Sequence, residues 1–175
     1  MSTETSTKTG SCLCGKIKYR LEGHAATPIY NTVCHCLNCR KWLGSAFLTA
    51  SICSKNVSQA ILLNTNPSQY SHKATQGFSI TEGEDVLRRY VDDKTGSGKP
   101  LTRTFCGTCG SSLFAFTPLR EDIVSVAAGT LDDFESWEPA REQWCIHRAD
   151  FVENVRGISE ESRHAMNVQA KPAKD

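Results

Sequence analysis

The sequence lacks the long apolar runs and the one-sided charge that mark several classes of protein. Its longest apolar stretch lies around Ala60, Ile61, Leu62 and Leu63, far short of the 18 or more residues that span a bilayer. The chain does not start with a basic segment followed by an apolar stretch, so the sequence predicts no secretory signal. Twenty Lys and Arg against 19 Asp and Glu leave a net charge of +1, too little to hold a phosphate backbone. Membranes and nucleic acid are therefore not expected as partners.

Cysteine is present in an odd number, which favours metal binding over a disulfide framework. The nine cysteines make up about 5% of 175 residues, which is below the range of small disulfide frameworks. Without a secretory signal we expect reduced thiols, a cytoplasmic location and metal binding. The length suits one domain, which we place at residues 10–157, between polar tails at 1–9 and 158–175. The sequence gives no indication of the oligomeric state.

Seven cysteines lie in three clusters with the spacing of metal ligands. The segment CGTCG, at residues 106–110, has the spacing of a zinc-ribbon turn, in which small residues let the chain fold tightly around sulfur. Such a turn needs two further ligands, and the CxC pair near the start of the chain can supply them because alternate side chains of a strand share a face. The sequence therefore predicts one closed structural zinc site formed by Cys12, Cys14, Cys106 and Cys109.

The middle cluster brings three sulfurs within six residues, in VCHCLNCRKWLGSAF. These are Cys34, Cys36 and Cys39, and we interpret them as the ligands of a second zinc with a vacant position for a water or a substrate thiolate, if no fourth side chain closes the site. His35 lies between two ligands, and alternation predicts that it faces away from their metal. Arg40 and Lys41 follow the last ligand and either receive a substrate carboxylate or are simply solvated.

The rest of the chain predicts a mostly β fold. A short helix is expected at Asn38–Leu43, ended by Gly44, and residues 53–76, rich in Ser, Asn and Gln, are expected to form a loop insertion. We therefore predict a single zinc-centred domain of several short antiparallel sheets with one short helix after the second cysteine cluster. Short segments rich in β-branched or aromatic residues are predicted as strands: Ile17–Leu21, Ile29–Val33, Ala46–Ile52, Val86–Val91, Leu101–Phe105, Leu113–Phe116, Ile123–Ala128 and Trp144–Ile146.

Five segments together resemble the glutathione-dependent formaldehyde-activating enzyme family, also called S-(hydroxymethyl)glutathione synthase, which shares its domain with centromere protein V. They read GSCLCGKIKYR, CHCLNCRKWLGSAF, FSITEGEDVLRRY, RTFCGTCGSSLF and VAAGTLDD. The resemblance implies a structural zinc on the first and last cysteine pairs. It also implies a second, exchangeable zinc on the middle three cysteines, where formaldehyde and the glutathione thiol combine.

Two functions from different classes follow from these observations. One is a zinc-dependent carbon–sulfur lyase that forms or cleaves a thiol adduct, with glutathione or a similar thiol, of formaldehyde or another small electrophile. The other is a non-catalytic, zinc-stabilised module that binds a protein. A purely structural protein has no need of a three-sulfur site that lacks a fourth ligand, so the enzyme is favoured, with Cys34, Cys36 and Cys39 at its reaction centre.

The remaining polar and sulfur-bearing residues carry weaker signals. Cys53 and Cys145 stand alone and are interpreted as packing residues. Among the isolated histidines, His147 is the best candidate for a residue near a pocket. Asp132 and Asp133 are expected to close a turn or to form a pocket rim.

Overall fold

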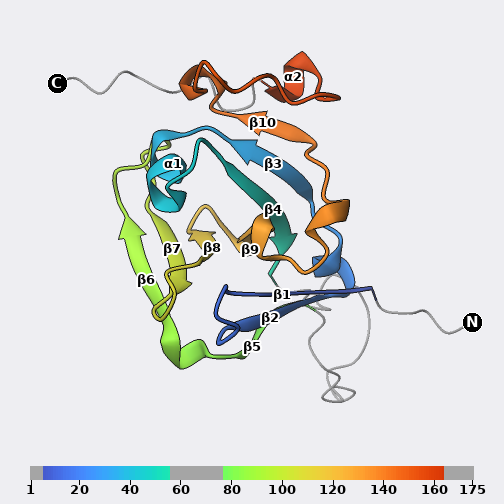
Figure 1. Ribbon diagram of the computed structural model, residues 1–175, viewed down its shortest axis with the longest axis vertical. Coiled ribbons are helices and arrows are strands. Elements are labelled where there is room, and N and C mark those ends of the chain that lie inside the picture. The colour runs from blue at the N-terminus through green and yellow to red at the C-terminus, as the bar shows by residue number, and fades with distance from the viewer. Residues whose placement is uncertain (1–5, 56–76, 164–175) are drawn as a thin grey trace, which may run out of the picture.

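Two β-sheets pack against one another in the computed structural model, which describes residues 6–55 and 77–163 (Figure 1). The smaller sheet has the strand order β1-β2-β5, and the larger has the order β10-β3-β4-β9-β8-β7-β6. All neighbours are antiparallel except β10 and β3, which run parallel. The strands are β1 (Thr7–Ser11), β2 (Lys18–Glu22), β3 (Tyr30–Cys34), β4 (Leu48–Ser54), β5 (Phe78–Glu82), β6 (Leu87–Asp92), β7 (Leu101–Cys106), β8 (Ser112–Thr117), β9 (Arg120–Ala127) and β10 (Arg141–Gln143).

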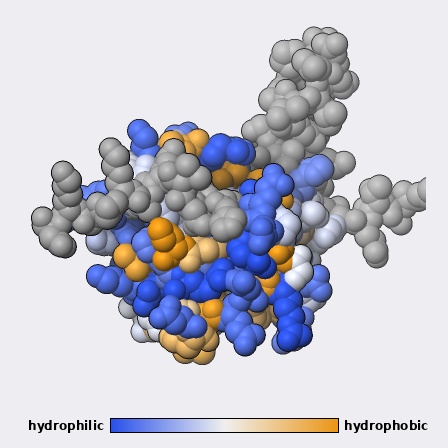
Figure 2. Space-filling view, turned by 90° about the horizontal axis from the view of Figure 1, so that it is seen from above, coloured by the Kyte–Doolittle hydropathy of each residue, from blue (hydrophilic) through white to orange (hydrophobic). Residues whose placement is uncertain are grey.

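Helical structure among the described residues is short. It comprises α1 (Leu37–Leu43), the single turn α2 (Glu160–Arg163) and 3-10 turns at Gly23–Ala26, Glu84–Val86, Ala128–Thr130, Phe134–Ser136 and Cys145–His147. The mostly β prediction is thus confirmed. No described helix is long and apolar enough to cross a membrane. The face seen in Figure 2 is mainly hydrophilic, with apolar residues in small separate groups.

Most of the predicted strands are confirmed within a few residues, but Trp144–Ile146 is wrong. Trp144 has a left-handed backbone with φ of 58°, and a 3-10 turn follows it, so this aromatic segment bends out of the sheet. The neighbouring Arg141–Gln143 forms β10 instead. Strands β1, β5 and β10 were not predicted, because their sequences TKTGS, FSITE and REQ are mostly polar. Pairing with neighbouring strands, rather than burial of both faces, makes them strands.

The helix predicted after the second cysteine cluster is present as α1. Cys36 is its N-cap, with a sulfur that accepts the backbone N–H of Cys39. Gly44 ends it in the left-handed conformation, with φ of 63°, and its N–H donates to the carbonyl of Arg40. Glycine adopts this conformation without the steric cost that a Cβ imposes. The predicted start is one residue late and the predicted stop is confirmed.

The domain limits given by the sequence remain a prediction. Strand β1 begins at Thr7, inside the predicted N-terminal tail, and α2 ends at Arg163, beyond the predicted limit at 157. Cys53 belongs to β4, so the predicted loop insertion cannot begin there. The insertion otherwise falls on residues 56–76, which lie outside the described part of the chain.

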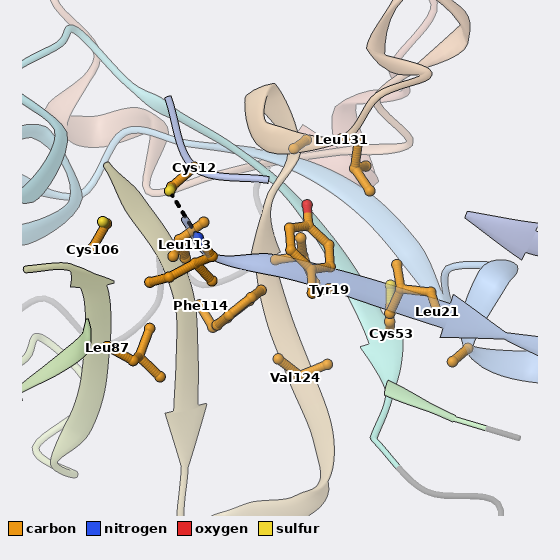
Figure 3. Packing of buried hydrophobic residues seen from close by; sticks show 14 of the residues in the cluster. Cys12, Tyr19, Leu21, Cys53, Leu87, Cys106, Leu113, Phe114, Val124 and Leu131 are labelled. Carbon is orange, nitrogen blue, oxygen red and sulfur yellow. Dashed lines mark hydrogen bonds between the residues drawn. The ribbon is translucent and has the colours of Figure 1, made fainter. Parts of the chain in front are cut away.

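The smaller sheet covers one face of the larger sheet. Phe114 and Val126 are paired across β8 and β9 and have no exposed surface. The ring of Tyr19 from β2 meets Phe114 edge-on at 4.9 Å, and Leu21 lies nearby in the same cluster (Figure 3). Burying each such side chain contributes about 1.5–3 kcal/mol. This packing fixes the sheet, and alternation directs its other residues to the opposite face.

The opposite face carries small residues at its centre. A row of paired residues runs across five strands: Arg103, Ala115, Ser125, Ile52 and Tyr30. The second and third members, Ala115 and Ser125, have short side chains, whereas the other three have longer ones. The sheet therefore has a hollow at its centre, and this hollow positions the candidate site.

Candidate metal centres and the adjoining cavity

Four cysteines from two distant segments meet beside the contact between the sheets. Cys12 and Cys14 lie in the turn between β1 and β2, Cys106 ends β7, and Cys109 lies in the turn before β8. The four sulfurs all lie within 4.8 Å of one another, with 3.5 Å between Cys12 and Cys14 and 3.8 Å between Cys14 and Cys106. A tetrahedral zinc with Zn–S bonds of about 2.3 Å needs sulfurs about 3.8 Å apart. The four residues therefore fit such an ion.

Backbone N–H groups and one hydroxyl support the sulfurs of this four-sulfur cluster. The N–H of Ile17 donates to Cys12 at 3.2 Å and that of Thr108 to Cys106 at 3.4 Å. The hydroxyl of Ser111 lies 3.2 Å from the sulfur of Cys109. This hydroxyl, followed by the backbone N–H of Ser111, lowers the pKa of Cys109 to about 5. Ser111 thus favours the thiolate of Cys109, which is the metal-binding form of cysteine.

The sequence-based reason for the first cysteine pair was wrong in its detail. Cys12 and Cys14 do not lie in an extended strand, because β1 ends at Ser11. The chain turns after them, with the N–H of Gly15 bonded to the carbonyl of Cys12 at 2.9 Å and φ of 72° at Gly15. A turn therefore brings the two thiols together, in the same way as the turn at Cys106 and Cys109.

The second cluster lies where β3 passes into α1. Cys34 ends β3, Cys36 caps α1 and Cys39 lies within its first turn. Their three sulfurs all lie within 4.8 Å of one another. Among the described residues no His, Cys, Asp or Glu joins them at that distance. The structure thus brings the three predicted residues together as a three-sulfur cluster.

His35 faces away from this cluster, as alternation predicted. Its side chain has no exposed surface, and its Nε2 lies 2.8 Å from Oε1 of Glu142 on β10. Glu142 also accepts from Arg148 at 3.1 Å and from Arg163 at 3.2 Å. His35 therefore anchors the C-terminal segment to β3, directly behind two of the cysteines.

Arg103 is the neighbour of the three-sulfur cluster that the sequence did not single out. Its side chain is buried, with Nη1 3.7 Å from the sulfur of Cys39. Nε and Nη2 each lie 2.8 Å from Oδ2 of Asp92, and the guanidinium stands 5.0 Å from the centre of the Trp42 ring. Asn38 donates to both oxygens of the same carboxylate at 2.9 Å. No local motif could reveal this arrangement, because 64 residues separate Arg103 from Cys39.

The ionisation of the three-sulfur cluster is uneven. Hydrogen bonds from Cys34 and Cys39 hold the pKa of Cys36 well below its ordinary value, with the N–H of Cys39 and the charge of Arg103 acting in the same direction. The hydrogen bond between Cys36 and Cys34 raises the pKa of Cys34 in turn. Cys36 is therefore the sulfur that ionises first.

A cavity of about 260 Å³ opens beside the three sulfurs. It occupies the hollow on the free face of the larger sheet, and all five members of the cross-sheet row line it together with the three cysteines. The loop between β6 and β7 and Trp144 complete its wall. The four-sulfur cluster does not line it. Of the two clusters, only the three-sulfur cluster thus lines this cavity.

The weaker sequence candidates lie elsewhere. Arg40, Lys41 and His147 are not among the residues that line the cavity, and the His147 ring stacks on Trp144 with centres 6.3 Å apart. Cys53 is fully buried in the core, as its interpretation as a packing residue implies. The half-buried Cys145 donates to the carbonyl of Arg163 at 2.8 Å.

The two adjacent aspartates that follow β9 bind β1 rather than the cavity. Asp132 accepts from Thr9 at 2.6 Å, and Asp133 lies 2.5 Å from the amine of Lys8. Neither lines the cavity. They therefore hold the smaller sheet to the loop after β9 and do not form the rim of this cavity.

Comparison with known proteins gives one family and one structural likeness. The family model described as glutathione-dependent formaldehyde-activating enzyme matches residues 7–81 and 65–147, which together make up more than half of the chain. No curated protein sequence matches significantly. The crystal structure of a Rhodobacter sphaeroides protein is 17% identical, covering 71% of this chain and 88% of that chain with a TM-score of 0.47. So distant a likeness says nothing about function.

Proposed function

Because the chain belongs to the glutathione-dependent formaldehyde-activating enzyme family, we propose that it is a zinc-dependent carbon–sulfur lyase. It forms or cleaves the adduct of a thiol, glutathione or a close relative, with formaldehyde or another small electrophile. The observation that carries this proposal is the three-sulfur cluster with a cavity beside it. The four-sulfur cluster has four donors and does not line this cavity, and we assign it a structural ion.

The donor set of each cluster agrees with this assignment. Four thiolates complete a tetrahedron, as in structural zinc sites, whereas three protein ligands leave one position for a reactant, as in catalytic sites. Zinc held by Cys34, Cys36 and Cys39 would supply the positive charge that keeps a substrate thiol ionised near neutral pH. The protein's own side chains then position the reactants and exclude water.

Arg103 and its partners hold the cluster in place from inside the fold. The double contact with Asp92 fixes the plane of the guanidinium, and Nη1 faces the sulfur of Cys39. A buried cation beside thiolates favours their charged form. Groups behind metal ligands commonly change metal affinity or activity by about 10- to 100-fold. Arg103 is therefore a positioning residue for the three-sulfur cluster.

The reaction needs no external oxidant or reductant. In the forming direction a bond is made between the thiol sulfur and the carbonyl carbon, the carbonyl π bond breaks, and the proton lost from sulfur ends on the carbonyl oxygen. Cleavage of the adduct reverses each change. The task of the site is therefore to bring the two reactants together at high effective concentration.

A comparison of single cysteine variants tests the proposal. Exchange of formaldehyde between its free form and its glutathione adduct is followed by NMR, with the spontaneous rate subtracted, and zinc per chain is measured by elemental analysis. Cys39→Ser is expected to lose one zinc and at least about tenfold of the protein-dependent rate, in line with the loss of a ligand. Cys145→Ser, the same substitution outside both clusters, is expected to keep both.

Two results would contradict the lyase. One is a wild-type rate no higher than the spontaneous one with glutathione and with other small thiols, and the other is an unchanged rate in Cys39→Ser. Two tightly held zinc ions that do not respond to thiols would instead support the non-catalytic protein-binding module.

A further inference from the structure

We propose that the cavity beside the three-sulfur cluster binds an apolar substituent of the electrophile. The natural adduct then carries an alkyl or aryl group rather than the single carbon of formaldehyde. This inference rests on the proposed function, which places the reacting sulfur at Cys34, Cys36 and Cys39. It is carried by the lining, the size and the charge of the cavity.

The walls of the cavity are largely hydrocarbon. Leu48, Ala50 and Ile52 alternate along β4 and all face it. The same cavity is lined by Leu101, Leu119 and Ile123 from the β7, β8 and β9 side of the sheet. Apolar walls favour an apolar occupant by about 25 cal/mol for each Å² removed from water. Formaldehyde, with a single carbon, offers almost no such surface.

The volume is also too large for a one-carbon electrophile. A dry cavity of about 150 Å³ lined by similar residues holds benzene, and this cavity measures about 260 Å³. The space exists because Ala115 and Ser125 stand side by side at the centre of the cross-sheet row. An aromatic ring or a chain of several methylenes fits above them.

The charges that line the cavity argue against placing glutathione itself inside. Glutathione has two carboxylates and an ammonium group, but no Asp or Glu is among the lining residues. Arg103 is already paired with Asp92, and Lys99 is the one other lining cation. Within the described part of the chain the Lys99 amine makes no ion pair. Lys99 can therefore bind one carboxylate at the rim of the cavity, while the interior suits the uncharged part of the adduct.

Trp144 and the loop between β6 and β7 close one side of the cavity. A Cβ on Gly96 would lie 2.8 Å from the Trp144 ring, so the glycine lets loop and ring touch. Trp144 is only 7% exposed and holds a backbone conformation that is unfavourable for a bulky residue. Such strain persists where the surroundings enforce it, commonly at ligand sites. The large ring is thus held as part of the apolar wall.

Binding of S-methyl-, S-butyl- and S-hexylglutathione to the zinc-loaded protein tests this inference by titration calorimetry. Each methylene that enters the cavity is expected to raise the affinity about threefold to fourfold, from about 0.8 kcal/mol per buried methylene. Ser125→Phe fills the centre of the hollow and is expected to remove this dependence on chain length. Ser79→Phe places the same ring on the exposed surface of β5 and is expected to keep it.

The outcomes separate this inference from the proposed function. Equal affinity for the three S-alkylglutathiones would contradict this inference even if formaldehyde and glutathione turn over. So would an equal dependence of affinity on chain length in the two Phe variants. Chain-length dependence that Ser125→Phe removes would support it even if no aldehyde reacts. Should Ser125→Phe fail to fold by circular dichroism, Ala115→Leu fills the neighbouring position and makes the same prediction.

Discussion

The two cysteine clusters use the same donor atom and differ in what surrounds it. In the four-sulfur cluster the partners of sulfur are neutral, namely backbone N–H groups and the hydroxyl of Ser111. The three-sulfur cluster also has a backbone N–H partner, that of Cys39, but in addition it has the buried cation Arg103, and a cavity lies alongside. The number of donors and the nature of their neighbours, rather than the ligand type, therefore separate a structural centre from a reactive one.

The clusters also differ in what they connect. The four-sulfur cluster joins the turn after β1, in the smaller sheet, to the turn after β7, in the larger. The three-sulfur cluster joins the end of one strand to the helix that follows it. Loss of the first should separate the sheets, whereas loss of the second should leave them packed.

The largest expected effect is on folding, in Cys106→Ser. This variant should lose the structural zinc and with it several kcal/mol of the free energy of unfolding, since structural zinc contributes on the order of 10 kcal/mol in small modules. Denaturant unfolding and zinc analysis measure both. Cys39→Ser serves as the comparison and should stay within about 1 kcal/mol of wild type. Equal destabilisation of the two variants would contradict the assignment of the structural role to the four-sulfur cluster alone.

A smaller effect is expected in Arg103→Lys, which keeps the charge but cannot hold Asp92 through two nitrogens. Zinc affinity of the three-sulfur cluster should fall by about 10- to 100-fold, measured by competition with a chromogenic chelator, while the four-sulfur cluster keeps its ion. The exposed Arg20→Lys is the control and should change neither. If both clusters weakened alike, the argument that Arg103 acts on one of them would fail.

The smallest expected effect is a preference in alkylation after mild chelation of the exchangeable zinc. An ordinary thiol is only a few per cent ionised at pH 7, whereas the lowered pKa keeps Cys36 a thiolate well below that pH. Burial raises the pKa of Cys145, which should react slowly until the pH rises. Iodoacetamide at pH 7 should label Cys36 at least about tenfold faster than Cys145 by mass spectrometry. Similar rates for the two would contradict the assignment of Cys36.

Local patterns of composition predicted much of the fold. The wrong and missed strand predictions lie where composition is a poor guide to strand pairing. β-Branched and aromatic segments such as Ile123–Ala128 correspond to strands. Trp144–Ile146 has the same composition but bends away, because Trp144 packs against Gly96 from a distant loop. The polar β10 is a strand because β3 pairs with it. Pairing partners, which composition does not record, decided these cases.

Local sequence is enough to predict which sulfurs meet within each motif, because CxC, CxxC and CxCxxC place their thiols within the reach of one turn. It also determined the helix after the second cluster, through Gly44, and the turn of His35 away from the sulfurs. Pairing across the sheet, by contrast, brings Arg103 behind Cys39 and places Ala115 beside Ser125, which leaves a hollow at the centre of the sheet. Those contacts depend on the register between strands far apart in the chain, which no local spacing encodes.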